Sequence, residues 1–191
     1  MISNQQRVEN YKKMFPRFPA PRYDERWIDA VWMLGNNYKG SGYYGAYPPQ
    51  YLKRMNALFF EKQRIVHVFS GSLPKGDYTR FDINPNLGDV IGNAENIDSL
   101  FQPQSFDIAY CDPPYSDVDA ERYGYPMINR RKVLDSVHNI VETGGHVVWL
   151  DTMLPMFSKE KFHLMGLIAI VRSTNHRVRL ASIFKRNDNS S

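Results

Sequence analysis

The chain of 191 residues has little of what disulfide-rich, metal-binding or membrane proteins need. Its single cysteine, Cys111, excludes an internal disulfide and indicates a reducing compartment. Its five histidines show no spacing typical of zinc ligands, so we expect no metal site. No apolar run approaches the length that spans a bilayer, and Met1 is followed by polar residues. These absences predict a cytoplasmic protein that does not bind a membrane.

Repeats, low-complexity tracts and dividing linkers are absent as well, which favours one globular unit. The hydrophobic content of 42% is ordinary for such a fold, and so is the charged fraction of 23%. The net charge of +4 permits a polyanionic partner but does not demand one. Composition alone therefore leaves both an enzyme and a binding protein open.

The most informative stretch is residues 106–115, FDIAYCDPPY. Its apolar start predicts a short buried strand, and two prolines end it because proline cannot donate to a sheet ladder. Asp112 then lies at the carboxyl end of a strand, where open α/β sheets bind their ligands. A carboxylate, carbonyls beside the prolines and an aromatic ring suit a planar ring that carries an exocyclic amine. The alternative is a strand-ending turn in which the aspartate caps the backbone.

Strands alternating with helices predict a mostly parallel α/β sheet with one reversed strand. We expect strands over residues 64–69, 78–83, 90–91, 106–111, 146–150, 163–171 and 178–184, the last two as an antiparallel hairpin, and helices over 24–34, about 49–59 and 130–142. Gly144 and Gly145 would stop the last helix, and residues 116–132 would form a polar loop. The short connections after the first two strands leave no room for the usual crossover helices.

Asp-Pro-Pro-Tyr behind a short apolar strand resembles the catalytic motif of S-adenosylmethionine-dependent amino methyltransferases, above all those that modify adenine N6 in DNA. The resemblance covers roughly residues 40–185 and implies a Rossmann-like class I methyltransferase fold with S-adenosylmethionine as cofactor. It implies a catalytic set of Asp112, Pro113, Pro114 and Tyr115. The Asp112 carboxylate and the Pro113 carbonyl would accept hydrogen bonds from the amine, and Tyr115 would stack on the target base.

The resemblance also implies cofactor contacts from Tyr44, Tyr47, Phe69, Gly71, Asp82 and Asn93. The sequence FSGS around Gly71 stands where the family has a glycine-rich turn, and Asp82 would accept hydrogen bonds from the ribose diol. Asn93 would contact the adenine ring. The alternative for Asp82 is an aspartate that starts a turn. The segment around Tyr44 and Tyr47 is similar to an aromatic-proline segment that lines the methionine end of the cofactor, but a flexible surface loop fits it as well.

Basic side chains on two segments are expected to flank the pocket: Arg122, Arg130, Arg131, Arg172 and Arg177. The strand over 163–171 should run parallel to 106–111, which would bring the turn over 172–177 to the active face. These side chains would cradle a phosphate backbone, of DNA rather than RNA. The alternative is a solvated, charged turn.

We expect three segments: an N-terminal arm and helix over 1–35, a methyltransferase-like domain over 36–185 and a disordered tail over 186–191. The fold uses most of the residues after the motif, so recognition of a target sequence in the nucleic acid would come from loops, from a partner subunit or not at all. Three functions stay open. They are a DNA adenine-N6 methyltransferase, an RNA or small-molecule amino methyltransferase (for RNA, at guanine N2 or adenine N6), and an inactive methyltransferase-like subunit that binds nucleic acid.

Overall fold

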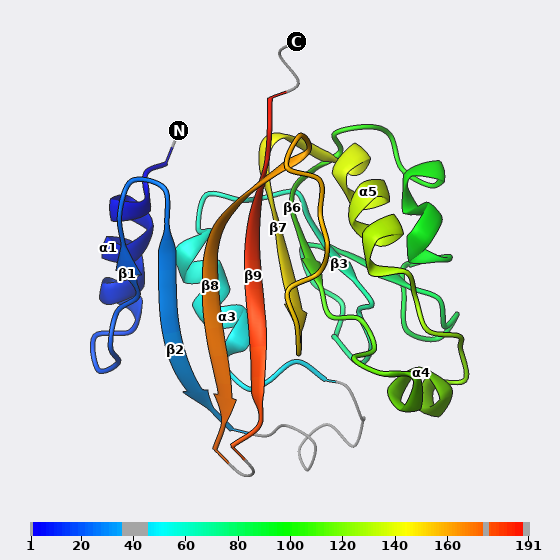
Figure 1. The fold of residues 1–191 in the computed structure, drawn as a ribbon, viewed down its shortest axis with the longest axis horizontal. Helices are drawn as coiled ribbons and strands as arrows, with labels where there is room; N and C mark the ends of the chain where they lie inside the picture. Colours follow the sequence, from blue (N-terminus) through cyan, green and yellow to red (C-terminus); the bar gives the residue numbers. More distant parts are fainter. Residues whose placement is uncertain (1, 36–45, 174–175, 189–191) are drawn as a thin grey trace.

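A computed structural model describes residues 2–35, 46–173 and 176–188 of the chain (Figure 1). The helical elements are α1 (Asn4–Met14), α3 (Tyr51–Leu58), the 3-10 helix η1 (Ala94–Ser99), α4 (Asp117–Tyr123) and α5 (Arg130–Ile140). The strands are β1 (Arg22–Tyr23), β2 (Ile28–Leu34), β3 (Ile65–Val68), β4 (Thr79–Asp82), β5 (Val90–Ile91), β6 (Phe106–Cys111), β7 (Val141–Asp151), β8 (Phe162–Arg172) and β9 (Val178–Arg186).

The strands form one nine-stranded sheet in the order β1-β2-β8-β9-β7-β6-β3-β4-β5. Neighbouring strands are parallel except in the pairs β1–β2, β7–β9 and β8–β9. The predicted mostly parallel sheet with a terminal antiparallel hairpin is therefore confirmed. Because β9 is antiparallel to both β7 and β8, β8 runs in the direction of β6, as predicted.

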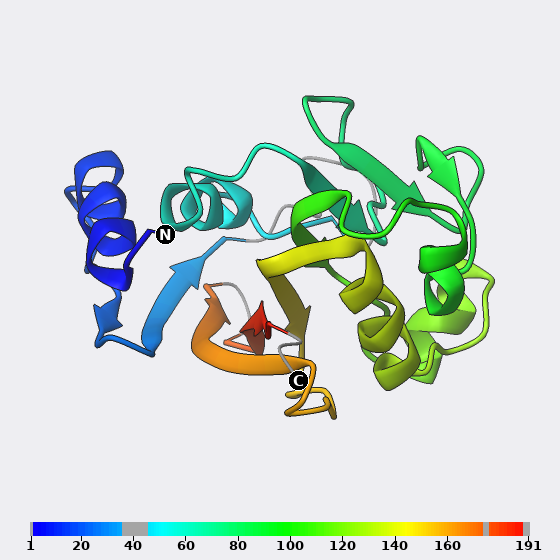
Figure 2. The same cartoon turned by 90° about the horizontal axis from the view of Figure 1, so that it is seen from above.

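Two hydrophobic cores lie on the two faces of the sheet, and β6 contributes to both. Ile108 and Tyr110 point into the core with α1 and α3, whereas Ala109 and Cys111 point into the core with α5 and η1. This alternation is the period of two that a β-strand imposes on its side chains. Seen from above, α1 and α3 lie on one side of the sheet and α5 lies on the other (Figure 2).

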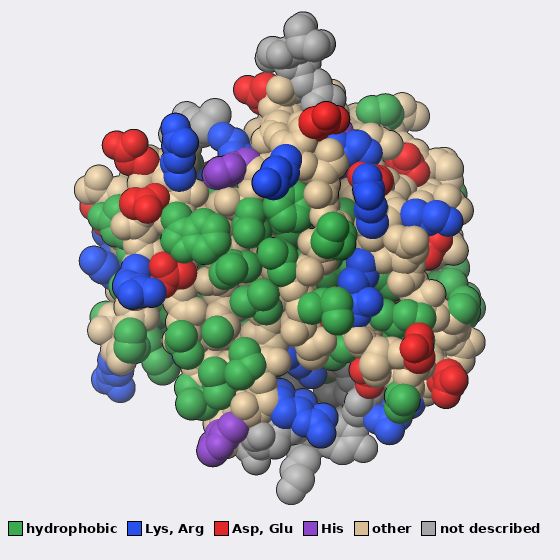
Figure 3. Space-filling view, in the orientation of Figure 1, with side chains coloured by type: hydrophobic (Ala, Val, Ile, Leu, Met, Phe, Trp, Pro, Cys, Tyr) green, Lys and Arg blue, Asp and Glu red, His purple; other side chains and the backbone are tan. Residues whose placement is uncertain are grey.

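The predicted helix over 24–34 is wrong, because residues 28–34 form β2, which pairs with β8 along its whole length. Val31, which a helical stripe would bury, is 70% exposed. Within the described residues, no helix covers the outer face of β2, β8 and β9, where hydrophobic side chains gather (Figures 1 and 3). The Asp24 carboxylate accepts the N–H groups of Arg26 and Trp27, so it caps a turn and not a helix.

The irregular arm predicted over 1–23 is corrected by α1, which begins with a capping box between Ser3 and Gln6. The helix buries Val8 and Tyr11 against the sheet. A serine followed three residues later by glutamine is a recognised helix start, and this signal was available in the sequence.

Three boundaries near the C-terminal half also differ from the prediction. The loop predicted over 116–132 contains α4, which Ser116 caps at its start and Gly124 ends in a left-handed conformation. Gly144 and Gly145 lie inside β7, because α5 already ends at Ile140. A Cβ on Gly145 would lie 2.9 Å from the Asp107 carbonyl oxygen, so close strand packing requires this glycine. Arg186, which the prediction placed in the tail, belongs to β9.

The short connections after β3 and β4 are confirmed. Residues 69–78 and 83–89, all described, contain turns and no helix. The carboxyl ends of β3, β4, β5 and β6 therefore meet at one edge of the sheet with only short loops above them. Among the described residues, no helix is long and apolar enough to cross a membrane.

Candidate active site

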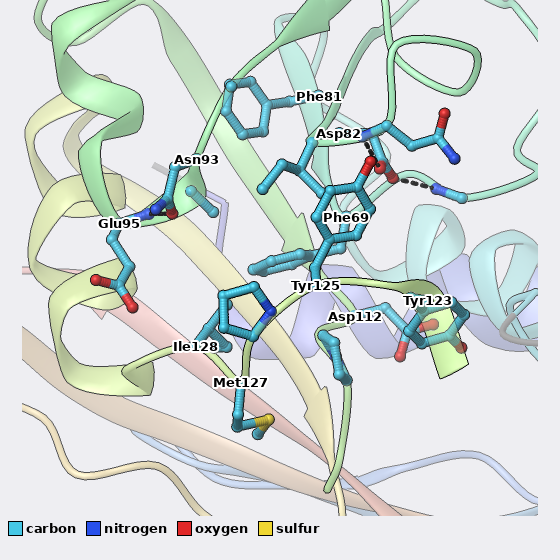
Figure 4. Close-up of a pocket in the computed structure, with 17 residues that line it drawn as sticks. Phe69, Phe81, Asp82, Asn93, Glu95, Asp112, Tyr123, Tyr125, Met127 and Ile128 are labelled. Carbon is cyan, nitrogen blue, oxygen red and sulfur yellow. Dashed lines mark hydrogen bonds between the residues drawn. The ribbon is translucent and has the colours of Figure 1, made fainter. Parts of the chain in front are cut away.

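An open cavity lies at the carboxyl ends of β3, β4, β5 and β6 (Figure 4). Its walls come from these strand ends and from the segment between α4 and α5: Phe69, Gly71, Phe81, Asp82, Ile83, Asn84, Gly92, Asn93, Ala94, Glu95, Asp112, Pro114, Tyr123, Tyr125, Pro126, Met127 and Ile128. A concave site with apolar walls and a few polar groups is typical of a cofactor site. It brings together six of the predicted catalytic and cofactor-binding residues: Phe69, Gly71, Asp82, Asn93, Asp112 and Pro114.

Asp82 holds the two turns at one end of the cavity. Its Oδ2 accepts the N–H of Gly71 and its Oδ1 accepts the N–H of Asn84, each at 2.9 Å. Each carboxylate oxygen can accept a second hydrogen bond, so Asp82 can still accept hydrogen bonds from the hydroxyl groups of a ligand. Gly71 has a φ of 51°, a conformation that glycine adopts without strain.

Phe69, at the end of β3, has a φ of 63°, which is uncommon for an aromatic residue. Phe69 lines the cavity (Figure 4). Strained backbone of this kind clusters at ligand sites, where the surrounding structure holds it. The conformation supports a functional position for Phe69 at the mouth of the cavity.

Asn93 and Glu95, at the start of η1, line the wall of the cavity opposite Asp82 (Figure 4). The Asn93 side-chain oxygen accepts the N–H of Glu95 at 2.9 Å and so caps η1. The Glu95 carboxylate accepts the N–H of Asn129 at 2.7 Å, which ties η1 to the start of α5. With Ile128 beside them, these residues form a slot with polar edges and an apolar face.

Asp112 lies where the cavity meets a cluster of aromatic rings. The Tyr115 hydroxyl donates to Asp112 Oδ1 at 2.5 Å. Burial raises the pKa of Asp112 to about 6, although the nearby Arg179 charge and the hydrogen bond from Tyr115 lower it. The carboxylate is therefore ionised above this pH and can accept further hydrogen bonds.

Tyrosines surround Asp112 on the side outside the cavity. Tyr47 and Tyr51 stack with ring centroids 5.6 Å apart, and the Tyr47 hydroxyl lies 3.3 Å from Nδ1 of His67. Burial raises the pKa of both tyrosines well above its usual value, and the Asp112 charge raises it further. Burial also lowers the pKa of His67 to about 3, so this imidazole is neutral. Tyr47 thus lies near the motif, while Tyr44 lies outside the described residues.

Arg130 forms an internal ion pair, and its side chain is only 19% exposed. Its Nε donates to Asp151 at 2.7 Å, and its guanidinium also donates to the Tyr115 carbonyl oxygen at 3.0 Å. Asp151 is fully buried and also accepts the indole N–H of Trp149. Arg130 therefore positions the backbone of the motif.

The other predicted basic residues lie on two segments. Arg131 is exposed beside Asp135, and Arg122 lies near the end of α4. Arg172 and Arg177 close the β8–β9 turn, where the Arg172 N–H donates to the Arg177 carbonyl oxygen at 3.0 Å.

The site also contains groups outside the predicted sets of catalytic, cofactor-binding and nucleic-acid-binding residues. Arg179 lies with its guanidinium carbon 4.7 Å from the centroid of the Tyr115 ring. Residues 123–128 form a whole wall of the cavity. The only available signal was position, since Arg179 follows the hairpin turn and residues 123–128 follow the motif. Among the described residues, no cluster of His, Cys, Asp or Glu could hold a metal ion.

No family model and no curated protein matches the chain. Among solved structures, TrmN from Thermus thermophilus is similar, with a TM-score of 0.51 and 12% sequence identity. The match covers 74% of this chain and 50% of TrmN, so the chain spans about half the length of that protein. The likeness shows the fold alone, a mixed α/β sheet that is mostly parallel and has antiparallel strands at its C-terminal end.

Proposed function

We propose that this protein transfers a methyl group from S-adenosylmethionine to the exocyclic amine of a nucleobase. The observation that carries the proposal is the position of Asp112. Its carboxylate lies at the carboxyl end of β6 and lines the same cavity as Asp82, which ends β4, and Asn93, which follows β5. An acceptor for an amine and the groups that suit an adenosine cofactor thus meet in one place.

The cavity fits S-adenosylmethionine on chemical grounds. Asp82 would accept hydrogen bonds from the ribose diol, since its oxygens keep acceptor sites beyond their bonds to Gly71 and Asn84. Asn93 and Ile128 would hold the adenine ring in the polar-edged slot, and Phe69 would lie toward the methionine end. When bound, the cofactor supplies an electrophilic methyl group on a sulfonium.

The chain's own residues would act on the amine. A nucleobase amine is a poor nucleophile because its lone pair is delocalised into the ring. The Asp112 carboxylate and the Pro113 carbonyl would accept its two N–H groups and hold the nitrogen in line with the methyl group. Such positioning lowers the activation barrier by on the order of 7 kcal/mol. Asp112, with a pKa of about 6, would then take the proton that the methylated nitrogen releases.

The substrate could be DNA or RNA, and different observations favour each. The Asp-Pro-Pro-Tyr resemblance favours adenine N6 in DNA, whereas the fold likeness to TrmN favours RNA, with adenine N6 or guanine N2 as the target. We propose RNA as the substrate, with DNA as the alternative. Target recognition would then fall to the loops at the carboxyl edge of the sheet or to a partner subunit.

One variant, compared with the wild type, tests the proposal in two assays. Calorimetric titration should show that the wild type and Asp112→Ala bind S-adenosylmethionine equally well, because Asp112 would contact the amine and not the adenosine. The same variant should lose methyl transfer to a mixed RNA or DNA pool. A wild type that binds no S-adenosylmethionine would favour an inactive nucleic-acid-binding subunit, which the short β3–β4 connection would explain.

A further inference from the structure

Arg179 lies against the catalytic motif, near the start of β9. It shares the face of β9 that carries the buried Ala181 and Ile183, which is the face covered by α3. Its guanidinium carbon lies 4.7 Å from the centroid of the Tyr115 ring, and that ring donates its hydroxyl to Asp112. Neither Arg179 nor Tyr115 lines the cofactor cavity.

The charge of Arg179 acts on three groups of the site. Burial raises the pKa of Asp112, of Tyr115 and of Tyr51, and in each case the Arg179 charge opposes the rise. The guanidinium thus lies over the Tyr115 ring, close enough to Asp112 and to the start of α3 for its charge to act on both.

A target base that stacks on Tyr115 with its amine at Asp112 needs this same space. A guanidinium is flat and stacks on aromatic faces much as a heterocyclic ring does. Arg179 and the base therefore compete for one position. The guanidinium must leave before the base can enter.

A phosphate is the group that would draw the Arg179 guanidinium away from the Tyr115 ring. Guanidinium groups bind phosphate through two parallel hydrogen bonds, which are stronger than a stacking contact. A nucleic-acid strand carries a phosphate beside every base, whereas a free nucleoside carries none. Arg172 and Arg177, on the turn that precedes Arg179, add positive charge along the same edge.

We infer that Arg179 covers the target-base position until a strand phosphate draws it away, so that the enzyme accepts a base within a strand and rejects a free nucleoside. This inference rests on the proposed function. It names Arg179 as a residue that determines specificity, and it excludes a small-molecule amine as the substrate.

The test compares methyl transfer to two probes: mixed-sequence single-stranded RNA and an equimolar mixture of free nucleosides. Arg179→Met should raise KM for RNA about tenfold, lower the salt slope of RNA binding by about one unit and raise transfer to nucleosides. Arg179→Lys should keep most RNA binding, since it keeps the charge, yet gain nucleoside activity because an ammonium does not stack as a flat group. Arg26→Met is the charge-matched control, because Arg26 precedes β2 at the end of the strand that lies away from the β8–β9 turn. This variant should leave the preference for RNA over nucleosides unchanged.

The outcomes separate the two ideas. Failure of the wild type to methylate any probe, including DNA, would overturn the proposed function and the inference with it. A wild type that methylates strands while Arg179→Met keeps the same preference over nucleosides would overturn the inference alone. A merely structural role would lower transfer to both probes together and would weaken S-adenosylmethionine binding, which calorimetry would detect.

Discussion

Replacing Asp112 by asparagine should stabilise the protein at alkaline pH. The carboxyl has a pKa of about 6 in the folded chain against 3.8 for the ordinary group, because burial penalises its charged form. Between these two values the folded state holds a proton that the unfolded state has lost. Stability therefore falls as the pH rises through this window. A shift of about two units corresponds to about 3 kcal/mol in total.

Asparagine has nearly the same shape and cannot ionise, so Asp112→Asn escapes this loss. We expect the variant to match the wild type near pH 4 and to exceed it by about 2–3 kcal/mol at pH 8. Urea unfolding of both proteins across this pH range measures the difference. A variant that is less stable at pH 8, or a difference that does not change with pH, would refute a raised pKa at this position.

Asp107, at the start of the same strand, is a control with the opposite sign. Burial raises the pKa of its carboxyl, but hydrogen bonds from Arg64 and Gln63 outweigh this and hold it below the usual value. Its ionised form therefore stabilises the fold, and this contribution is lost as the pH falls through the lowered pKa. Asp107→Asn should be less stable than the wild type at pH 8, with a loss that shrinks in acid.

Three further predictions concern the cofactor site, the internal ion pair and the hairpin turn. Asp82→Ala should weaken S-adenosylmethionine binding by about 1–3 kcal/mol in calorimetry, and unchanged affinity would place the ribose elsewhere. Arg130→Met should cost about 3–5 kcal/mol of stability in urea because it leaves buried Asp151 uncompensated; a loss below 1 kcal/mol would contradict this. Replacing Arg172 and Arg177 together should reduce the salt slope of RNA binding by about one to two phosphate contacts, and an unaltered slope would place the strand elsewhere.

The parts of the fold that the sequence predicted correctly are those with strong local signals. The apolar run 106–111 and the two prolines after it placed β6 and put Asp112 at a strand end. The strands over 65–68, 79–82 and 178–186 carry the same kind of local pattern. Since parallel strands bring their carboxyl ends to one edge, the approximate site followed from these elements alone.

Residues 28–34 show why local patterns can fail. Their apolar residues satisfy both a helical and an alternating pattern, and the pairing with distant β8 decided between them. The contacts around the motif are equally non-local. Arg179 reaches Tyr115 from the last strand, and Arg130 reaches Asp151 across the sheet edge. No short-range spacing in the sequence marks such pairs.

Mass spectrometry of nucleosides from RNA and DNA, each incubated with the protein and S-adenosylmethionine, tests the proposed activity most directly. A methyl group on the exocyclic amine of adenine or guanine, made by the wild type and not by Asp112→Ala, is the predicted result, with RNA favoured over DNA. Unmodified nucleosides from both nucleic acids, under conditions in which the protein binds S-adenosylmethionine, would contradict it.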